Sequence, residues 1–205
     1  MEGRGRLANH PRFSQAYILG QDILEKMVGD VRTEQNQRAS GATLIVGAGT
    51  GLDIVQLGST VSRILLLEPD DTMRGYLEER HPDLQTISSP AESMDVADSE
   101  FDTVITSLVL CTVDRVDQTL REIHRVLKPK GQYLFMEHVK HDLPVSQWLQ
   151  NTVNPLWKRI GGGCNLNRDI RHYLFHSPLE VVEYSLVKPS FLIPIVAGRA
   201  VKADI

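Results

Sequence analysis

The sequence predicts an α/β fold: a mostly parallel sheet of seven strands, with helices on both faces and an antiparallel hairpin at its C-terminal end. Two observations carry this prediction. Apolar runs alternate with segments of helical periodicity over about 95 residues, which is typical of βαβ units in a parallel sheet. The last two apolar runs, 180–187 and 193–202, are separated only by KPSFL. That connection is too short for a helical crossover, so these runs should pair antiparallel.

The first element is a helix over 13–31, where apolar residues recur at roughly helical spacing. The polar run 32–41 then indicates an exposed connection. Pro69 and Asp70 can open a second helix, and Pro129 and Gly131 should end a third. The remaining elements follow from short apolar runs and helical periodicity: strands at 43–46, 64–67, 84–87, 102–107 and 133–136, and helices at 69–80 and 116–127.

The C-terminal third begins with a helix over 144–160, which Trp148 and Trp157 are expected to pack. The segment GGGCNLNRD then forms a loop that leads into a short helix. Asn167 or Asp169 can cap that helix, because both side chains accept hydrogen bonds from free N–H groups.

Composition limits the classes of function. A chain of 205 residues with 41% hydrophobic content suffices for one domain. The net charge of -4 gives no basic field, so nucleic acid is not an expected partner. Cys111 and Cys164 lack CxxC or Cys/His spacing, so we expect no disulfide, zinc site or other metal. Neither a secretory signal nor a run of roughly 20 apolar residues is present, which favours a soluble, reducing, cytoplasmic setting.

A glycine-rich loop, GAGTGLD, follows the first strand. Gly47, Gly49 and Gly51 allow a sharp turn and a ligand lying directly against the backbone. The dinucleotide fingerprint GxGxxG would need glycine where Leu52 stands, and no Walker lysine follows. The loop therefore favours a compact ligand over a pyrophosphate, with a ligand-free turn as the alternative.

Glu68 ends the second strand at the carboxyl edge of the sheet. Its distance from the loop is close to the roughly 20 residues at which an acid binds ribose hydroxyls. A carboxylate accepts both hydrogen bonds of a cis-diol, so loop and acid together indicate a nucleoside ligand. An exposed acid at a strand end is the weaker interpretation.

The segments GAGTGLD, LLLEPDDTM and FDTVITSLVLCTVDRVDQTLREIHRVLKPKGQYLFMEHV resemble, in order and spacing, the class I methyltransferases that depend on S-adenosylmethionine (SAM). The resemblance covers about residues 13–135 and implies a Rossmann-like fold. It also implies SAM as cofactor, with S-adenosylhomocysteine as product. The cofactor contacts implied are Tyr17, Gly47, Ala48, Gly49, Thr50, Gly51, Glu68, Pro69, Met73, Ala91, Glu92, Ser107 and Leu108.

A closer resemblance rests on HPRFSQAY, LVLCTV, FMEHV and NPLWKRIGGGCNLNRD. Together these are similar to a branch of small-molecule methyltransferases that includes bacterial homologues and the microsomal thiol methyltransferases of animals. The animal members carry an N-terminal membrane anchor that this sequence lacks, so a membrane location is not carried over and peripheral membrane contact stays open. The resemblance implies a small-molecule acceptor, with a thiol or sulfide favoured.

Other functions stay open beside this one. A phospholipid or small-amine N-methyltransferase shares the cofactor motifs, and a non-catalytic SAM-binding module would keep them. An NAD-dependent oxidoreductase is disfavoured by Leu52 and by the terminal hairpin.

Catalytic candidates lie at the ligand edge of the sheet. His138 ends the fifth strand and can accept a proton, with a structural histidine as the alternative. Arg168 can face an anionic group of the acceptor and Asn165 lies in the same loop, with a plain structural turn as the alternative. Cys111 is expected to be a small buried residue.

A single domain over residues 1–205 accommodates these assignments, and the oligomeric state is left open. We expect an insert over residues 138–178 to cover the methyl-donor end of the SAM site, with Gly161 to Gly163 as a hinge. The expected parts are an N-terminal helical cover 1–42, a cofactor-binding core 43–137, a substrate-covering insert 138–178 and a terminal hairpin 179–205.

Overall fold

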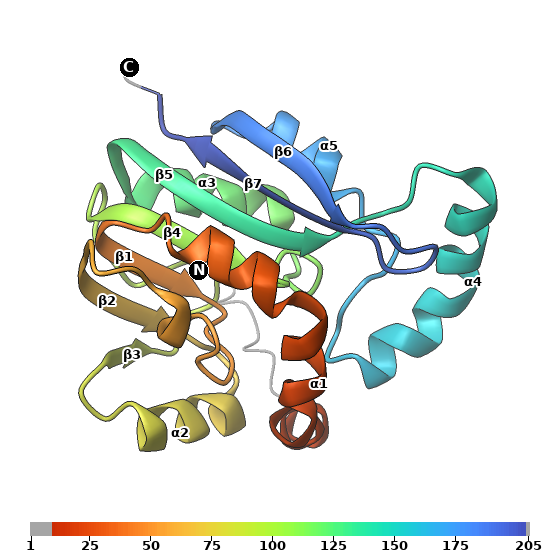
Figure 1. Cartoon of the computed structure of the whole chain (residues 1–205), viewed down its shortest axis with the longest axis horizontal. Coiled ribbons are helices and arrows are strands. Elements are labelled where there is room, and N and C mark those ends of the chain that lie inside the picture. Colours follow the sequence, from red (N-terminus) through yellow and green to blue (C-terminus); the bar gives the residue numbers. More distant parts are fainter. Residues whose placement is uncertain (1–9, 204–205) are drawn as a thin grey trace, which may run out of the picture.

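The computed structural model describes residues 10–203, so the first nine residues of the expected cover and the last two of the expected hairpin lie outside it. One sheet runs through the molecule in the order β3-β2-β1-β4-β5-β7-β6 (Figure 1). Only β7 runs antiparallel to its neighbours, β5 and β6, which confirms the predicted fold. The strands are β1 (Gly41–Val46), β2 (Val61–Leu67), β3 (Gln85–Ile87), β4 (Phe101–Ser107), β5 (Leu127–His138), β6 (Glu180–Lys188) and β7 (Ile195–Val201).

Helices cover both faces of the sheet, and alternation along the strands decides which side chains meet them. On one face Ile45, Leu66 and Ile105 pack with Leu77 of α2 (Asp71–Arg80). On that face α1 (Pro11–Asn36) also packs against β5 and β7. The opposite face is covered by α3 (Val116–Val126) and α5 (Ile170–Phe175). A short 3-10 helix, η1 (Ile54–Gln56), follows the glycine loop.

The helix α4 (Pro144–Ile160) covers neither face but lies beyond the end of β5 (Figure 1). Its anchor is the buried amide of Gln150, which donates to the carbonyls of Val139 and Leu192. Trp148 is 66% exposed, so the expectation that it packs the helix is wrong. Among residues 10–203, no helix has the length and apolar content that a membrane crossing requires.

The polar run after the first helix departs from the prediction. Residues 32–36 belong to α1, and three of them are buried rather than exposed: Arg32, Gln35 and Asn36. The Arg32 guanidinium donates to Asp53 at 2.9 Å, and the Asn36 amide donates to the same oxygen at 2.7 Å. These side chains are buried because they pair with a buried carboxylate, which hydrophobicity alone does not reveal.

The predicted starts of α2 and α5 are confirmed, and an aspartate caps each of these helices. Asp70 accepts hydrogen bonds from Thr72 N and Met73 N at the start of α2. Of the two candidates before α5, Asp169 is the cap. The helix α3 passes directly into β5 at Leu127, so Pro129 and Gly131 lie within the strand and not in a loop after the helix.

Candidate active site

The glycine loop joins the end of β1 to η1. Gly47 N and Ala48 N both donate to the carbonyl of Leu67, at 2.8 and 3.0 Å, which ties the loop to the end of β2. Gly47 has φ +65, and a Cβ there would lie 2.7 Å from Val109. Gly49 has φ +56, but the nearest atom to its Cβ position is the Met73 sulfur at 3.8 Å. Gly47 therefore serves packing, whereas the Cβ position of Gly49 is not crowded, as the close approach of a ligand to this backbone would require.

Glu68 lies beside this loop with 5% of its surface exposed. One carboxylate oxygen accepts from Gly49 N at 2.7 Å and the other from Asp70 N at 2.9 Å. Burial raises the pKa of Glu68 above its ordinary value, although the two N–H donors oppose that rise. Each oxygen keeps a second lone pair, so the carboxylate can still accept the two hydroxyls of a ribose.

Three further polar side chains belong to the candidate cofactor site: Tyr17, Thr50 and Ser107. The Thr50 hydroxyl is buried and has no hydrogen-bond partner in the part of the chain that the structure describes. Ser107 donates to Asp53 at 2.8 Å, at the end of β4. Burial raises the pKa of Tyr17 to about 12, so its hydroxyl stays protonated. An unpaired buried hydroxyl beside an uncrowded backbone position calls for a polar ligand atom, and the residues present fit SAM.

Other implied cofactor contacts have different partners. Glu92 accepts from Asp114 N and Arg115 N at 2.8 and 3.1 Å, so its carboxylate fixes the chain before α3. Ala91 is buried in the core, and Pro69 is half-buried beside Glu68. Leu108 has φ +61 and donates its N–H to the Met136 carbonyl, which starts a tight turn after β4.

That turn is held by Glu137, which is completely buried. Its carboxylate accepts from Val109 N, Leu110 N and the Thr106 hydroxyl, at 3.1, 3.0 and 2.9 Å. Burial raises the pKa of Glu137 to about 7, against the effect of these donors. The turn is therefore rigidly placed, and Cys111 on it is only 1% exposed.

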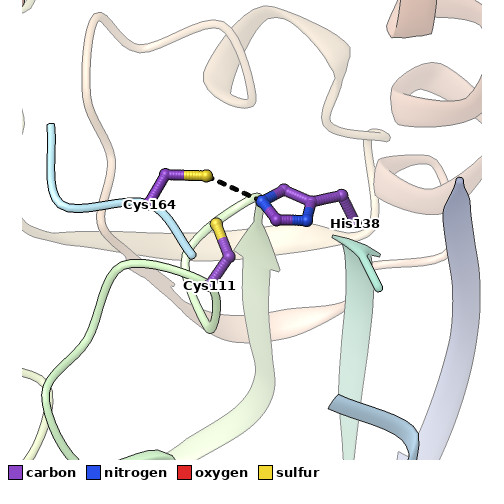
Figure 2. Close-up of side chains that lie close together, drawn as sticks. All are labelled: Cys111, His138 and Cys164. Carbon is purple, nitrogen blue, oxygen red and sulfur yellow. Dashed lines mark hydrogen bonds between the residues drawn. The ribbon is translucent and has the colours of Figure 1, made fainter. Parts of the chain in front are cut away.

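Cys111, His138 and Cys164 converge here, as Figure 2 shows. His138 Nε2 lies 2.8 Å from the Cys164 sulfur, which also accepts from Trp157 Nε1 at 3.2 Å. Hydrogen bonds lower the pKa of Cys164 well below its ordinary value, first from Cys111 and then from His138 and Trp157. Hydrogen bonding to Cys164 and burial raise the pKa of Cys111. We name these three residues the Cys–His–Cys cluster.

Cys111 and Cys164 have no motif spacing in the sequence, yet in space they lie close together. The loop after β4, the end of β5 and the loop after α4 meet at one edge of the sheet. The local signals were present, since Cys111 follows a strand and His138 ends one. Cys164 gave no such signal, because its position depends on how α4 folds back.

Arg168 and Asn165 support this cluster through backbone carbonyls. Arg168 Nη1 donates to the carbonyls of Leu110 and Val113 at 2.7 and 2.6 Å, so the structure does not aim it at an anionic acceptor. Asn165 donates its side-chain amide to the Cys111 carbonyl at 3.0 Å. Of the three catalytic candidates, only His138 brings its own side chain to the cluster.

Comparison with known proteins agrees with this geometry. Residues 44–135 match the family described as methyltransferase domain. Over 180 residues the chain is 33% identical to the thiol S-methyltransferase TMT1B of Homo sapiens, covering 80% of this chain and 72% of that protein. The chain belongs to the class I SAM-dependent methyltransferases.

More distant relatives share the core of this methyltransferase. The ubiquinone/menaquinone biosynthesis C-methyltransferase UbiE of Brucella anthropi is 28% identical over 144 residues, which cover 63% of this chain and 55% of UbiE. Phosphoethanolamine N-methyltransferase 2 of Haemonchus contortus, solved with SAM, superposes with a TM-score of 0.69 at 14% identity. That match covers 85% of this chain and 53% of the other, and it shows the shared fold.

Proposed function

We propose that this enzyme transfers the methyl group of SAM to the sulfur of a small thiol, with a sulfide as the nearest alternative. The observation that carries the proposal is the 33% identity to a thiol S-methyltransferase over 80% of the chain. This similarity extends well beyond residues 44–135, the part shared with methyltransferases in general. The proposed cover and insert lie outside that shared part, and they would hold the parts of an acceptor site.

Residues of the core would hold SAM. The backbone of Gly49, the Thr50 hydroxyl and the Glu68 carboxylate are the polar groups available, with Met73 beside them. When bound, SAM supplies a methyl group already activated by its sulfonium. The chain's own task is therefore to align an acceptor with that methyl group and to exclude water.

The acceptor thiol must lose its proton, because a thiol with a pKa of about 8.5 is mostly protonated at neutral pH. We place this step at the Cys–His–Cys cluster, which is buried at the edge where β4 and β5 end. His138 is the proposed catalytic residue. Arg168 and Asn165 are proposed positioning residues, since both bind carbonyls of the turn that carries Cys111.

The proposal also assigns a role to each of four consecutive parts of the chain. Residues 1–42 would cover the cofactor, 43–137 would bind it, 138–178 would cover the substrate, and 179–205 would close the sheet. Both cysteines are free and buried, which fits a reducing, cytoplasmic setting.

The test is turnover with a panel of acceptors. The purified chain would be incubated with SAM and a small alkyl thiol, a thioether, a primary amine or phosphatidylethanolamine vesicles. S-adenosylhomocysteine and the methylated product would be measured by mass spectrometry, with Gly49→Val as the matched control that should not bind SAM. We expect an S-methyl product from the thiol. Product from the amine or the vesicles alone would replace the proposal.

A further inference from the structure

We propose that the Cys–His–Cys cluster binds one zinc ion, whose fourth coordination position takes the acceptor thiol. The second half of this proposal rests on the proposed function, and the first half does not. The three ligand atoms are Cys111 Sγ, His138 Nε2 and Cys164 Sγ, and all lie within 4.8 Å of one another (Figure 2).

The distances suit a single ion. Zinc binds cysteine sulfur at about 2.3 Å and histidine nitrogen at about 2.0–2.1 Å, in tetrahedral geometry. Two such sulfurs are then about 3.8 Å apart, and sulfur and nitrogen about 3.6 Å apart. Nε2 and the Cys164 sulfur are 2.8 Å apart, and no pair exceeds 4.8 Å. Side-chain shifts of about 1 Å bring the three atoms to zinc-binding distances.

The donor set selects zinc among the common ions. Thiolate and imidazole ligands in a tetrahedral arrangement are typical of zinc, whereas magnesium and calcium prefer oxygen. Three protein ligands with one open position describe a catalytic zinc site, because structural sites are closed by a fourth. Two thiolates also balance the charge of the ion, which allows burial at 1% to 9% exposure of the three residues.

The surroundings hold the two cysteine ligands in place, as metal sites require. Trp157 donates its indole N–H to the Cys164 sulfur at 3.2 Å. The turn that carries Cys111 is fixed from one side by Glu137 and from the other by Arg168. The third ligand, His138, ends a central strand and is 4% exposed, and its Nδ1 has no hydrogen-bond partner among the described residues. Preformed ligands of this kind bind an ion without a large ordering cost.

The site also lies where an acceptor has to be. Cys111 belongs to the same turn as Leu108, which begins at the end of β4 beside Ser107. Ser107 is linked through Asp53 to the segment after the glycine loop. An acceptor held by the ion would therefore lie beside the turn that follows Ser107, next to the proposed SAM site. This region is buried, so water is excluded from it.

The proposed methyl transfer needs neither an oxidant nor a reductant. His138 Nε2 is then a ligand of the ion and not a base, so on coordination the thiol R–SH gives its proton to solvent and stays bound as thiolate. A sulfur lone pair then forms the new S–CH3 bond as the carbon–sulfonium bond of SAM breaks. The products are R–S–CH3, S-adenosylhomocysteine and one proton. The neutral thioether is a weaker zinc ligand than the thiolate, which favours its release.

Metal content tests the first half. The chain, purified with a phosphine reductant and without chelators, should contain about one zinc per chain by mass spectrometry. Cys111→Ser, Cys164→Ser and His138→Ala should each hold little or none, while His172→Gln on the exposed face of α5 should keep the wild-type content. Trp157→Phe, which removes only the donor to Cys164, should weaken zinc binding about 10–100-fold. Circular dichroism would check that each variant is folded. A folded wild-type chain that neither contains zinc nor binds added zinc would overturn the proposal.

Cobalt substitution tests the second half without any turnover. A Co²⁺-loaded chain should show sulfur-to-cobalt charge-transfer absorption that is lost in Cys111→Ser. Adding a small alkyl thiol in the absence of SAM should strengthen that absorption, because a third thiolate joins the ion. An unchanged spectrum would overturn the role of the ion in acceptor binding.

Metal removal separates this proposal from the proposed function. Thiol methylation that continues at full rate in chelator-treated, zinc-free enzyme would overturn the zinc proposal and leave the thiol acceptor intact. Zinc binding and thiol ligation without any S-methyl product from a SAM-bound chain would contradict the proposed function instead. We expect methylation to fall at least tenfold without zinc and to return when zinc is added.

Discussion

At the scale of single residues, Glu68 has two tasks that differ in their pH dependence. It braces the glycine loop through Gly49 N, and it would bind the ribose of SAM. Glu68→Gln keeps the shape of the side chain but removes the charge. We expect calorimetry to show SAM binding weakened by about 1.5–3 kcal/mol, which is typical of hydrogen bonds to a charged group. Unchanged affinity would remove Glu68 from the ribose site.

The raised pKa of Glu68 gives this prediction a pH dependence. The folded chain takes up the proton at a higher pH than the unfolded chain does. This carboxyl's contribution to stability is therefore fully present below its unfolded pKa and is lost as pH rises through the folded one. SAM affinity should change in the opposite direction and fall in weak acid, where the carboxylate is protonated, while Glu68→Gln shows no such change.

Gly49 offers a second test of the cofactor site. Valine at φ +56 costs about 1–2 kcal/mol of strain, less than the stability of an ordinary domain. The domain should remain folded, and SAM binding should be abolished because the side chain fills the space beside the loop. Gly75→Val is the matched control, since a Cβ on Gly75 in α2 contacts nothing within 4 Å. SAM binding by folded Gly49→Val would mean that no ligand approaches this backbone.

A substitution of Arg168 tests whether this residue affects acceptor methylation through the turn that carries Cys111. Removing its guanidinium in Arg168→Ala frees the Leu110 and Val113 carbonyls and loosens the turn that carries Cys111. We expect kcat/KM for the acceptor to fall about 10–100-fold while SAM affinity is nearly intact. Arg168→Lys should recover part of the loss, because it restores one donor. Equal losses for acceptor and cofactor would show a general defect of the fold.

These residues also show which parts of the candidate site a sequence pattern can indicate. Gly49 and Glu68 follow strands directly, so a local pattern locates them at the ligand edge. The Cys–His–Cys cluster joins two loops and the end of β5, which are far apart in the sequence. Its assembly depends on the course of α4, and spacing in the sequence carries no information about that course.

At the scale of elements, the strands and most helices could be predicted from their apolar periodicity, and α2 and α5 also from a capping aspartate. The end of α1 could not, because its last turn is polar. That turn is held by the Arg32–Asp53 ion pair, with side chains only 3% and 6% exposed. A buried pair between segments distant in sequence looks like an exposed connection when only hydrophobicity is considered.

The Arg32–Asp53 ion pair should contribute strongly to the free energy of unfolding. Arg32→Ala should destabilise the chain by about 3–5 kcal/mol in urea unfolding, because it leaves the Asp53 carboxylate buried beside fewer donors. Arg38→Ala removes an exposed pair with Glu183, with side chains 37% and 44% exposed, and should cost less than about 1 kcal/mol. Equal losses in the two variants would show that the buried pair has no special role in fixing α1.

At the scale of the whole molecule, ligand binding and folding are linked. SAM at 100 times its Kd should stabilise the chain by about 2.7 kcal/mol, because only the folded state can bind it. NAD at the same concentration should leave the thermal midpoint unchanged, since Leu52 replaces the third glycine of the dinucleotide fingerprint. A shift with NAD and none with SAM, measured by calorimetry, would contradict the cofactor assignment.

The hydrogen bond from Trp157 to the Cys164 sulfur has an optical consequence. A thiolate in contact with an indole quenches its fluorescence, so Trp157 should emit weakly while that sulfur carries a free negative charge. The only other tryptophan, Trp148, is largely exposed and should emit as it would in water. In a Trp148→Phe chain the remaining tryptophan fluorescence would come from Trp157 alone. Its brightness would then follow events at the buried sulfur in real time, without an added dye.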